Sequence, residues 1–517
     1  MDTSDLIIGA ILLLLVYLYI SYKNTYSYFD QNGVPCVTPW PFIGNAFDFI
    51  TMKKPLPIIH FDVYNQLAPH RFVGMFIGMK KAILIRDPEL IKTVLVKDFS
   101  YFQNRNENPN KTNFLNENLF YMKDEEWKNL RIKMTSTFTS SKMKQMFPLV
   151  QECGTKLHAV LEEISNGDDF NAKDICARFT IDVIGSCAFG LDINSLDNPN
   201  SVFRKMCDRA FGFSYAVILR LVFPKLHGFF NLFRKSKDVC GFFLNLVQKT
   251  VKYREQHKIV RGDFLDLLIN LKNEADGHKT DDHQARKDIE KFISQTGGKH
   301  SKNNVDVTIE IITAQCYLFF VGGFEQPSST LSFMLLELAR NQHIQDKLRE
   351  EIVKVLENNN NEFTYEAMKQ MKYLDMVIDE TLRRFPIFGI LSRECSIPYK
   401  IPGSEYVIPQ GTIVYTSMKG IHYDSKYYEK PNEFYPEHFT DEAKAKRPQY
   451  TFLSFGDGPR ACIAVRFARM QVKVGAVNLL KDFSYHVSPK LKHPVEFAPG
   501  IILSDIKGGI WLNCTRI

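Results

Sequence analysis

The sequence of 517 residues predicts a mainly α-helical fold with a small β region. Most of the stretch 60–390 spaces its apolar residues three or four positions apart, which is typical of helices with one buried face. One long helix is predicted from Val305 to about Arg340. After Pro386 the pattern changes to short strand-like segments, at 399–401, 406–409 and 411–415. We therefore expect one large domain, residues 46–517, in which a small sheet accompanies the helices.

An apolar or aromatic run, Leu6–Ile20, precedes this domain and predicts a membrane anchor over residues 1–24. The run is short for a span, but a thin bilayer of about 27 Å, such as that of the endoplasmic reticulum, tolerates it. Asp2 and Asp5 precede the run and Lys23 follows it, so the body should face the cytosol. A cleavable signal peptide is the alternative, but the basic segment and the small-residue cleavage site that it needs are missing. We expect an uncleaved, single-pass anchor in the endoplasmic reticulum membrane.

Residues 25–45 are predicted to form a proline-rich hinge between the anchor and the domain. Pro35, Pro39 and Pro41 stand close together in this segment. Proline fixes φ and stiffens an extended chain, so the segment would hold the domain at a set angle to the membrane. An ordinary N-terminal loop is the alternative.

The composition argues against several classes of protein. The 65 basic and 58 acidic residues give a net charge of +7, which is too diffuse to indicate nucleic-acid binding but suits an anionic membrane or an acidic partner. The ten cysteines include no C-x-x-C pair, so neither a zinc ribbon nor a dithiol redox site is indicated. Their scatter along a long chain argues against a disulfide scaffold and favours a reducing compartment.

Two segments of the domain differ from the rest in composition. Residues Phe203–Phe233 are rich in Phe, Leu and Val and are interrupted by Pro224. They predict either a buried helix pair or an apolar surface that dips into lipid. Residues 272–304 are polar and contain several glycines, which predicts a mobile surface loop between helices.

The most informative segment is Phe455–Ala464, which reads Phe-Gly-Asp-Gly-Pro-Arg-Ala-Cys-Ile-Ala. Cys462 follows a glycine-rich turn and precedes an apolar stretch with helical spacing. Glycines let backbone N–H groups approach the sulfur and stabilise its charge, so this thiolate could ligate iron. Arg460 offers a fixed cation for the acidic edge of a cofactor. A buried free cysteine in a loop is the alternative.

Pairs of charged or aromatic residues on predicted helices form a second group of candidates. Trp127 and Arg131 are four positions apart on one helix face and could hold a carboxylate together. Glu380 and Arg383 are three positions apart, and their apolar neighbours make a buried ion pair plausible. The loop 434–439 carries an acid and a possible cation that could complete a network with that pair. An exposed helix pair or an ordinary loop is the alternative in each case.

The long predicted helix contains an anomaly at residues 321–330, Val-Gly-Gly-Phe-Glu-Gln-Pro-Ser-Ser-Thr. Glycine costs about 1 kcal/mol and proline about 3 kcal/mol in a helix interior. Pro327 has no N–H and its ring crowds the carbonyl of Gly323, so a distorted turn is predicted. An opened turn beside Glu325 would make a groove for a small ligand or water. A simple kink that wraps the core is the alternative.

These five segments, in this order, resemble those of the cytochromes P-450, the haem-thiolate monooxygenases, and the resemblance covers essentially the whole chain. Within that family, three segments are similar to the insect microsomal branch that handles foreign compounds. They are Trp127–Ser140, Asp182–Gly190 and Arg466–Gln471. The resemblance implies a cytochrome P-450 fold, with residues 46–517 as a cytosolic haem-binding monooxygenase domain behind the N-terminal transmembrane helix.

The resemblance also implies roles for individual residues. Cys462 would be the proximal thiolate ligand of the iron in haem b, and its charge would favour cleavage of the O–O bond. Phe455 would pack near the sulfur, and Glu380 with Arg383 would form a structural ion pair behind the haem. The haem propionates would be bound by Trp127, Arg131, Arg393 and Arg460. The groove for oxygen on the distal side would be lined by Gly322, Gly323 and Glu325.

Three departures from the family pattern stand out. Gln326, followed by Pro327, replaces the usual threonine, whose hydroxyl orders the water chain that delivers protons. A glutamine amide holds water but does not relay a proton as a hydroxyl does, so we expect leakier coupling, with more peroxide per NADPH, or a proton path through Ser329 or water held by the freed Gly323 carbonyl. His438 replaces the usual arginine and exchanges a permanent charge for one that titrates near neutrality. Ala464 replaces a glycine, a change of one methyl group that haem binding should survive.

The implied activity is insertion of one oxygen atom from O2 into a lipophilic substrate with electrons from NADPH. NADPH–cytochrome P-450 reductase in the same membrane would deliver them, with cytochrome b5 as a further candidate donor, and no nucleic acid is expected. Basic residues that could meet the reductase are Lys128, Lys133, Arg466, Arg469 and Lys473. Candidate substrate contacts are Asn113–Phe120, Phe211–Phe223, Phe320, Phe388–Leu391 and Ile501–Leu503. A haem-thiolate isomerase or dehydratase without a reductase, and a non-catalytic haem-binding protein, stay open as alternatives.

Overall fold

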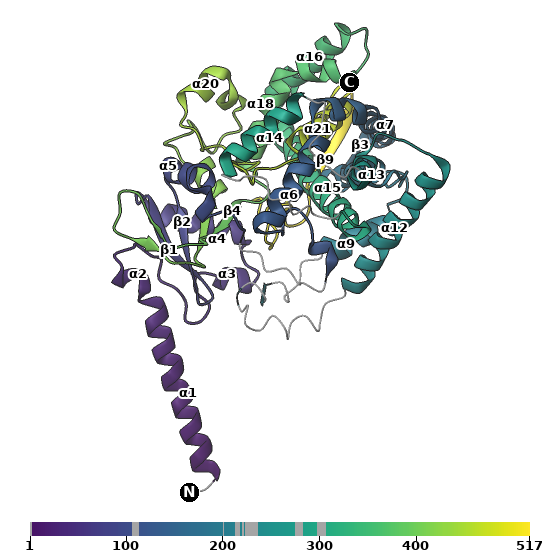
Figure 1. Cartoon of the computed structure of the whole chain (residues 1–517). Coiled ribbons are helices and arrows are strands. Elements are labelled where there is room, and N and C mark those ends of the chain that lie inside the picture. Colours follow the sequence, from purple (N-terminus) through teal and green to yellow (C-terminus); the bar gives the residue numbers. More distant parts are fainter. Residues whose placement is uncertain are drawn as a thin grey trace.

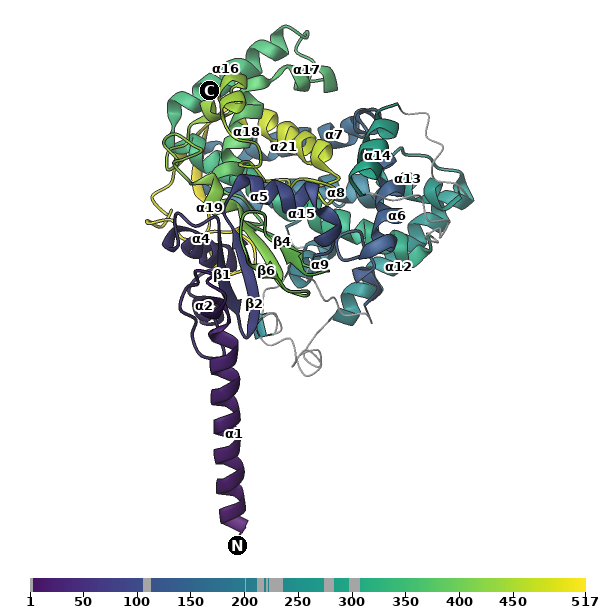
Figure 2. The same cartoon turned by 60° about the vertical axis from the view of Figure 1, so that its left-hand side comes forward.

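The computed structural model describes residues 3–105, 113–199, 201–211, 218–219, 222, 236–273, 283–296 and 307–517. Helices dominate this part of the chain and a smaller β region lies beside them, as predicted (Figure 1). The β region lies next to the N-terminal helix, and the larger helical part extends away from it in both views (Figures 1 and 2).

The N-terminal helix α1 (Thr3–Tyr26) projects from the body as a single rod (Figures 1 and 2). Its apolar side chains are exposed, for example Leu13 at 73% and Ile7 at 60%. Among the helices of the described residues, none combines the length and the apolar character required to cross a membrane.

The segment predicted as a hinge, residues 25–45, packs against the first strand of the sheet. It contains the short helix α2 (Tyr28–Gln31), whose Phe29 is fully buried. Gly74 N–H donates to Pro35 O at 2.7 Å, and Gly78 N–H donates to Ile43 O at 2.9 Å. These contacts attach the base of α1 to the body through several points rather than through one flexible joint.

The main sheet has the strand order β1-β2-β7-β4. Strands β1 (Phe72–Ile77) and β2 (Lys80–Ile85) form an antiparallel hairpin. Strand β7 (Ile413–Ser417) pairs parallel to β2, and β4 (Ile390–Glu394) pairs antiparallel to β7. The strand-like segments after Pro386 are therefore confirmed, whereas the sequence analysis missed β1 and β2.

Two smaller sheets complete the β region. Strands β5 (Tyr399–Lys400) and β6 (Val407–Ile408) form an antiparallel pair. Near the C-terminus, β8 (Phe483–Val487) and β9 (Trp511–Arg516) join β3 (Asn166–Asn171) in the order β3-β9-β8.

The remaining helical elements follow one another along the described chain. They are α3 (Phe47–Ile50), α4 (Leu56–Gln66), α5 (Pro88–Lys92), η1 (Thr93–Lys97), η2 (Phe99–Tyr101), η3 (Phe114–Asn116), α6 (Asp124–Thr135), η4 (Ser136–Phe138), α7 (Ser140–Ile164), α8 (Ala172–Ile184), η5 (Gly185–Phe189), α9 (Val202–Phe211), α12 (Ser236–His257), α13 (Phe264–Asn273), α14 (His283–Thr296), α15 (Ile309–Arg340), α16 (Gln342–Glu357), α17 (Tyr365–Gln370), α18 (Lys372–Arg384), α19 (Met418–His422), η7 (Pro436–Phe439), α20 (Asp441–Lys446) and α21 (Val465–Leu480).

The predicted long helix is α15, which runs through the centre of the helical part beside α8 and α21 (Figure 1). Thr308 caps its start by accepting a hydrogen bond from Ile311 N–H at 3.3 Å. The helix continues through Pro327, and the predicted distortion of this turn stays a prediction. Packing on both sides outweighs the unfavourable propensity, and the hydroxyls of Ser328 and Ser329 bond to Glu325 O at 3.0 and 2.8 Å inside this turn.

The structure tests the prediction for residues 272–304 but describes little of the segment Phe203–Phe233. Within the predicted loop 272–304, residues 283–296 form helix α14, which corrects that prediction. Its buried Ala285 and Phe292 face the core, and the Phe292 ring meets that of Trp127 edge-on at 5.5 Å. Most of the apolar segment Phe203–Phe233 lies outside the described residues.

Candidate functional site

Cys462 lies at the end of a tight loop that leads into α21. Two glycines in the left-handed region shape this loop, Gly456 with φ +68° and Gly458 with φ +70°. A Cβ atom at Gly458 would lie 2.0 Å from the carbonyl oxygen of Leu95, so only glycine fits there. The Cys462 N–H donates to Phe455 O at 2.8 Å, which places the backbone of Phe455 beside the cysteine.

Cys462 is an exposed residue, whereas the other described cysteines are buried or half-buried. Burial by the surrounding protein nevertheless raises the pKa of its thiol, while the Ala464 N–H and the guanidinium groups of Arg131 and Arg105 lower it. The thiolate form of Cys462 requires a strong cation at the sulfur, and a metal ion is the cation that deprotonates a thiol outright.

A metal at Cys462 would have to bring most of its ligands with it. Among the described residues, no group of three or more His, Cys, Asp or Glu side chains is arranged to hold a metal ion. Iron in a tetrapyrrole meets this condition, because the macrocycle supplies four ligands and the protein needs to supply only an axial one.

The three predicted propionate-binding arginines all have lowered pKa values, and repulsion from Arg105 contributes to each shift. Burial, followed by repulsion from Arg105, Arg393 and Arg131, lowers the pKa of Arg460 to about 7. Burial and Arg105 lower the pKa of Arg393 to about 9. Burial lowers the pKa of Arg131 to about 10, although Cys462 opposes this shift. A buried group of cations with depressed pKa values is the electrostatic form of an anion-binding site.

The geometry of this arginine cluster fits an acidic ligand with two carboxylates. Within the described ranges, Arg131, Arg393 and Arg460 form no ion pair with any carboxylate. The buried Nε of Arg393 has no hydrogen-bond partner among the residues that the structure describes. The two propionates of a haem would supply the missing acceptors and charges, so the residues present fit this cofactor.

Trp127 is fully buried, and its ring contacts Arg460 of the arginine cluster. The Arg460 guanidinium stacks on its indole face, 3.7 Å from the ring centroid. Arg460 Nε also donates to Gln103 O at 3.0 Å, and its Nη2 donates to Met122 O at 2.9 Å. These contacts fix the direction of the guanidinium before any ligand arrives.

Arg105 belongs to this cluster, and sequence reasoning missed it. Its guanidinium donates to Arg460 O and to Phe120 O, each at 3.1 Å, and stacks on the Phe120 ring at 4.2 Å. In the sequence Arg105 stands in a polar stretch without helical or strand spacing. Only the folded chain brings it to the cysteine, so no local signal could have identified it.

The candidate catalytic glycines of α15 point in different directions. Gly323 is buried, and a Cβ there would lie 2.2 Å from Ile184 Cδ1 of α8. Gly322 is exposed, and a Cβ there would have only one atom within 4 Å, Gln326 Oε1 at 3.9 Å. Gly322 and Gln326 therefore border the open side of the helix, whereas Gly323 permits close packing of α15 on α8. The assignment of Gly323 to the oxygen groove stays a prediction.

Glu325, the third candidate catalytic residue, is paired with a lysine that sequence reasoning missed. Lys173 Nζ lies 3.0 Å from Glu325 Oε1 and contacts Ser328 Oγ at 3.1 Å and Ser329 Oγ at 2.6 Å. Lys173 and Glu325 both line a polar cavity of about 400 Å³, which also includes Asp505. This cavity gives water a place next to the carboxylate on a side of α15 away from Gly322.

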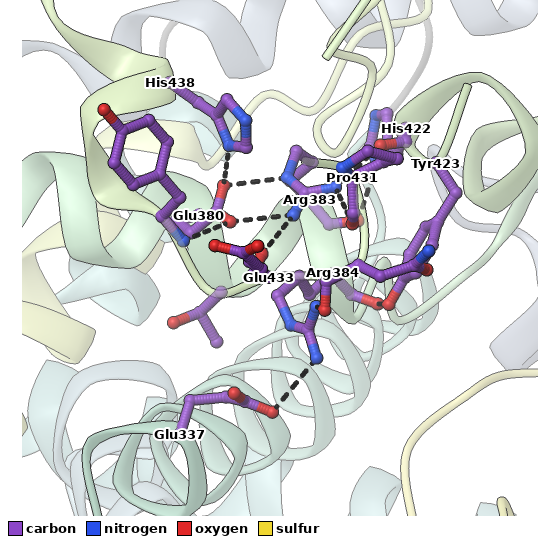
Figure 3. A network of polar contacts seen from close by, with 12 residues as sticks. Glu337, Glu380, Arg383, Arg384, His422, Tyr423, Pro431, Glu433 and His438 are labelled. Atoms are coloured by element: carbon purple, nitrogen blue, oxygen red, sulfur yellow. Dashed lines mark hydrogen bonds and ion pairs between the residues drawn. The ribbon is translucent and has the colours of Figure 1, made fainter. Parts of the chain in front are cut away.

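Glu380 and Arg383 form the buried ion pair that the sequence predicts (Figure 3). Glu380 accepts from Arg383 Nε and Nη2 at 2.7 Å each and from Tyr435 N–H at 2.9 Å. His438 Nδ1 lies 3.1 Å from Glu380 Oε2, so the predicted participation of residues 434–439 is confirmed. Burial opposes the ionisation of Glu380, but hydrogen bonds from Arg383 and His438 outweigh it and lower its pKa.

Several candidates for partner and substrate contacts lie in the interior. Lys133 and Lys473 are buried, and Lys473 is held by Asp375 at 2.8 Å, so neither is available to dock a reductase. Phe320 is fully buried among aromatic rings of the core. Phe388 and Ile501 are exposed and remain candidates for substrate contact.

Comparison with known proteins shows which family the chain matches in sequence. A model of the family described as Cytochrome P450 matches residues 34–512. Probable cytochrome P450 6a23 of Drosophila melanogaster is 36% identical over 524 residues, covering 99% of each chain. Cytochrome P450 6k1 of Blattella germanica is 37% identical over 516 residues, covering 99% of this chain and 97% of the relative. Cytochrome P450 6a2 of Drosophila melanogaster is 37% identical over 524 residues, covering 98% of each.

Proposed function

The chain belongs to the cytochrome P450 family and is a haem-thiolate monooxygenase that binds haem b; from this premise we propose its electron source, location and substrate class. It takes electrons from NADPH through a flavin reductase, NADPH–cytochrome P450 reductase, with cytochrome b5 as a second donor. One atom of O2 enters a lipophilic substrate, and the other leaves as water with two electrons and two protons. The observation that carries this proposal is exposed Cys462 beside Arg131, Arg393 and Arg460, which form no ion pair with an acid among the described residues.

The residues of the chain bind and orient the cofactor. Arg131, Arg393 and Arg460 hold its propionates, and Trp127 fixes the direction of Arg460. Cys462 would supply the thiolate ligand from a loop whose turns require glycine at positions 456 and 458. When bound, haem supplies the iron that activates oxygen, which no amino-acid side chain does.

The open side of α15 controls protons and water near the cofactor. Gln326 Oε1 lies over exposed Gly322, where an amide holds water without relaying its proton as a hydroxyl does. Glu325, which Lys173 holds beside the polar cavity on another side of the helix, is an acid of α15 that can exchange protons with water. We expect part of the reducing equivalents to leave as hydrogen peroxide.

The change Gln326→Thr tests this coupling. The variant should raise the ratio of product to peroxide, because a hydroxyl can pass a proton along a water chain. Product and peroxide are measured together in the purified enzyme reconstituted with reductase. An unchanged ratio contradicts the assigned role of Gln326.

We also propose that α1 attaches the enzyme to the endoplasmic reticulum membrane. The support is its exposed apolar surface, which is unusual for a helix in contact with water. A chain without residues 1–24 should leave the membrane fraction of a cell lysate and keep its haem spectrum. Equal partition of the full-length and shortened chains contradicts the proposal.

The substrates are proposed to be lipophilic compounds, foreign or endogenous. The relatives named above are insect cytochromes P450, and foreign compounds such as insecticides or plant toxins are therefore the first to test. The experiment is a turnover screen with reductase, NADPH and O2, in which substrate-dependent product is measured. Turnover without NADPH and O2 would instead favour an isomerase or dehydratase, and no specific observation supports that reading.

A further inference from the structure

A buried histidine that the family comparison leaves without a role joins the Glu380–Arg383 pair to the loop that carries Cys462. His422 is the last residue of α19 and is fully buried; Figure 3 shows it beside Arg383. Its carbonyl accepts from Arg383 Nη1 at 2.8 Å, and the Phe452 ring stacks on its imidazole at 5.4 Å. The residue therefore contacts both the ion pair and the start of the cysteine loop.

The hydrogen bonds of His422 fix its tautomer. Leu453 N–H donates to His422 Nε2 at 3.0 Å, so Nε2 carries no proton. The proton must then be on Nδ1, which lies 3.2 Å from Arg383 O and donates to it. Burial, followed by the charge of Arg383, lowers the pKa of His422 to about 3, so the ring stays neutral in this arrangement. One side of the ring accepts from the loop while the other donates to α18.

The bond to Leu453 acts at the point where the cysteine loop begins. Leu453 O accepts from Gly456 N–H at 2.7 Å, which closes the first turn of the loop. Next to it, Ser454 Oγ donates to Leu382 O of α18 at 3.1 Å. At the far end, Phe455 O accepts from Cys462 N–H at 2.8 Å. A shift of Leu453 would therefore be passed along the backbone to the sulfur.

We propose that His422 is a positioning residue that sets the cysteine loop so that the Cys462 thiolate meets the haem iron. The inference rests on the proposed role of Cys462 as the haem ligand. Without the imidazole acceptor, the buried Leu453 N–H has no partner, and the loop must move to satisfy it. The thiolate bond to iron would then break more readily, although the remaining contacts keep the haem bound.

The test compares His422→Gln with His422→Asn in the intact haem-containing enzyme. Gln is long enough for its oxygen to accept from Leu453 N–H, whereas Asn reaches only towards Arg383 O. The measurement is the carbon monoxide spectrum of the reduced protein, which distinguishes thiolate-ligated haem from haem that has lost the thiolate. We expect Gln to keep the thiolate band and Asn to lose it about tenfold faster, the factor typical of one lost buried hydrogen bond.

His60 offers a matched control, because it is also fully buried. Burial lowers the pKa of His60 to about 4, and its Nδ1 lies 2.9 Å from Leu56 O. Its Nε2, however, has no hydrogen-bond partner and holds no loop. His60→Phe should keep the thiolate band, whereas His422→Phe should lose it even when the haem content and unfolding temperature match.

Two outcomes separate this proposal from the proposed function. If the unmodified enzyme shows no thiolate band, the role of Cys462 fails and the proposal fails with it. If the unmodified enzyme shows the band but Gln and Asn at position 422 lose it at equal rates, His422 is a packing residue only. Should His422→Phe not fold, the comparison of Gln with Asn alone decides.

Discussion

The molecule contains two clusters of buried arginine side chains, and they differ in whether a carboxylate is paired with the arginine. In the first, Arg383 donates to Glu380 through Nε and Nη2, and its remaining hydrogens go to three backbone carbonyls. In the second, Arg131, Arg393 and Arg460 lie together without a carboxylate ion pair in the described part of the chain, and their pKa values are lowered. The first cluster is complete in the protein alone, and the second is not.

The first cluster stabilises the fold, whereas the second is suited to bind an anionic ligand. A buried ion pair with all its hydrogen bonds made stabilises the surrounding backbone and resists the loss of either partner. A group of buried cations without an acid is unfavourable by itself and becomes favourable when an anion binds. Changes in the first cluster should therefore affect unfolding, and changes in the second should affect haem.

The largest expected effect is that of Cys462→Ser. Serine is a poor iron ligand under these conditions, so the thiolate band of the reduced carbon monoxide complex should disappear and turnover should fall to background. The measurements are that spectrum and product formation with reductase. Cys36→Ser, at a half-buried cysteine of the N-terminal segment, is the control and should keep both. A thiolate band in Cys462→Ser would mean that another residue is the ligand.

Among these variants, replacement of Glu380 in the Glu380–Arg383 cluster should lower the free energy of unfolding most. Glu380→Leu leaves the Arg383 charge buried without its partner, which should lower the free energy of unfolding by about 3–5 kcal/mol. Chemical denaturation followed by circular dichroism measures this change. Glu405→Gln breaks the exposed pair with Lys400 and should have no measurable effect. Similar losses in both variants would contradict the assigned role of the buried pair.

The pH dependence of the unfolding free energy provides a second test of the role of Glu380. Because the folded chain lowers the pKa of Glu380, its carboxylate contributes stability above the pKa of the unfolded chain, about 4.3. That contribution is lost as the pH falls through the folded pKa. The difference in unfolding free energy between the unmodified chain and Glu380→Leu should therefore shrink as the pH falls below about 4.

In the incomplete cluster, Arg460→Leu should act on haem more than on the fold. Loss of a charge-assisted hydrogen bond of about 1.5–3 kcal/mol should make haem leave about tenfold to a hundredfold faster. Transfer of haem to an excess of apomyoglobin measures this rate. Arg447 is the control, because its guanidinium also stacks on an aromatic ring, that of Tyr428 at 4.3 Å, but donates to His438 O and is not part of the arginine cluster. Arg447→Leu should lower the unfolding temperature and leave the haem-loss rate unchanged.

The smallest effects are expected at the two neighbouring glycines of α15. Gly323→Ala places a methyl group against the buried Ile184 and should destabilise the fold by about 1–3 kcal/mol. Gly322→Ala projects into open space and should be neutral or stabilise by up to about 1 kcal/mol. The Gly322 variant should instead alter the affinity for small haem ligands such as imidazole. An equal loss of stability in both variants would contradict the assignment of the two faces.

The sequence was sufficient for features that depend on local spacing. The glycines and the arginine before Cys462 predict its loop, and the three-residue spacing of Glu380 and Arg383 predicts their pair. It was not sufficient where distant segments meet. Arg105 and Lys173 reach their sites only through the packing of other elements. Which of two adjacent glycines faces the open side depends on how α8 crosses α15, and a single helix pattern carries no information on that crossing.

The parallel pairing of β2 with β7 has a consequence for synthesis of the chain. Ile85 pairs with Thr416, 331 positions later. At a translation rate of about 5–20 residues per second, the β1–β2 hairpin waits about 20–60 s on the ribosome for its neighbouring strand. During that time its open edge can pair with other chains, and an isolated hairpin is only marginally stable. Nascent chains of this enzyme should therefore depend on chaperones that cover strand edges until residues 413–417 have emerged.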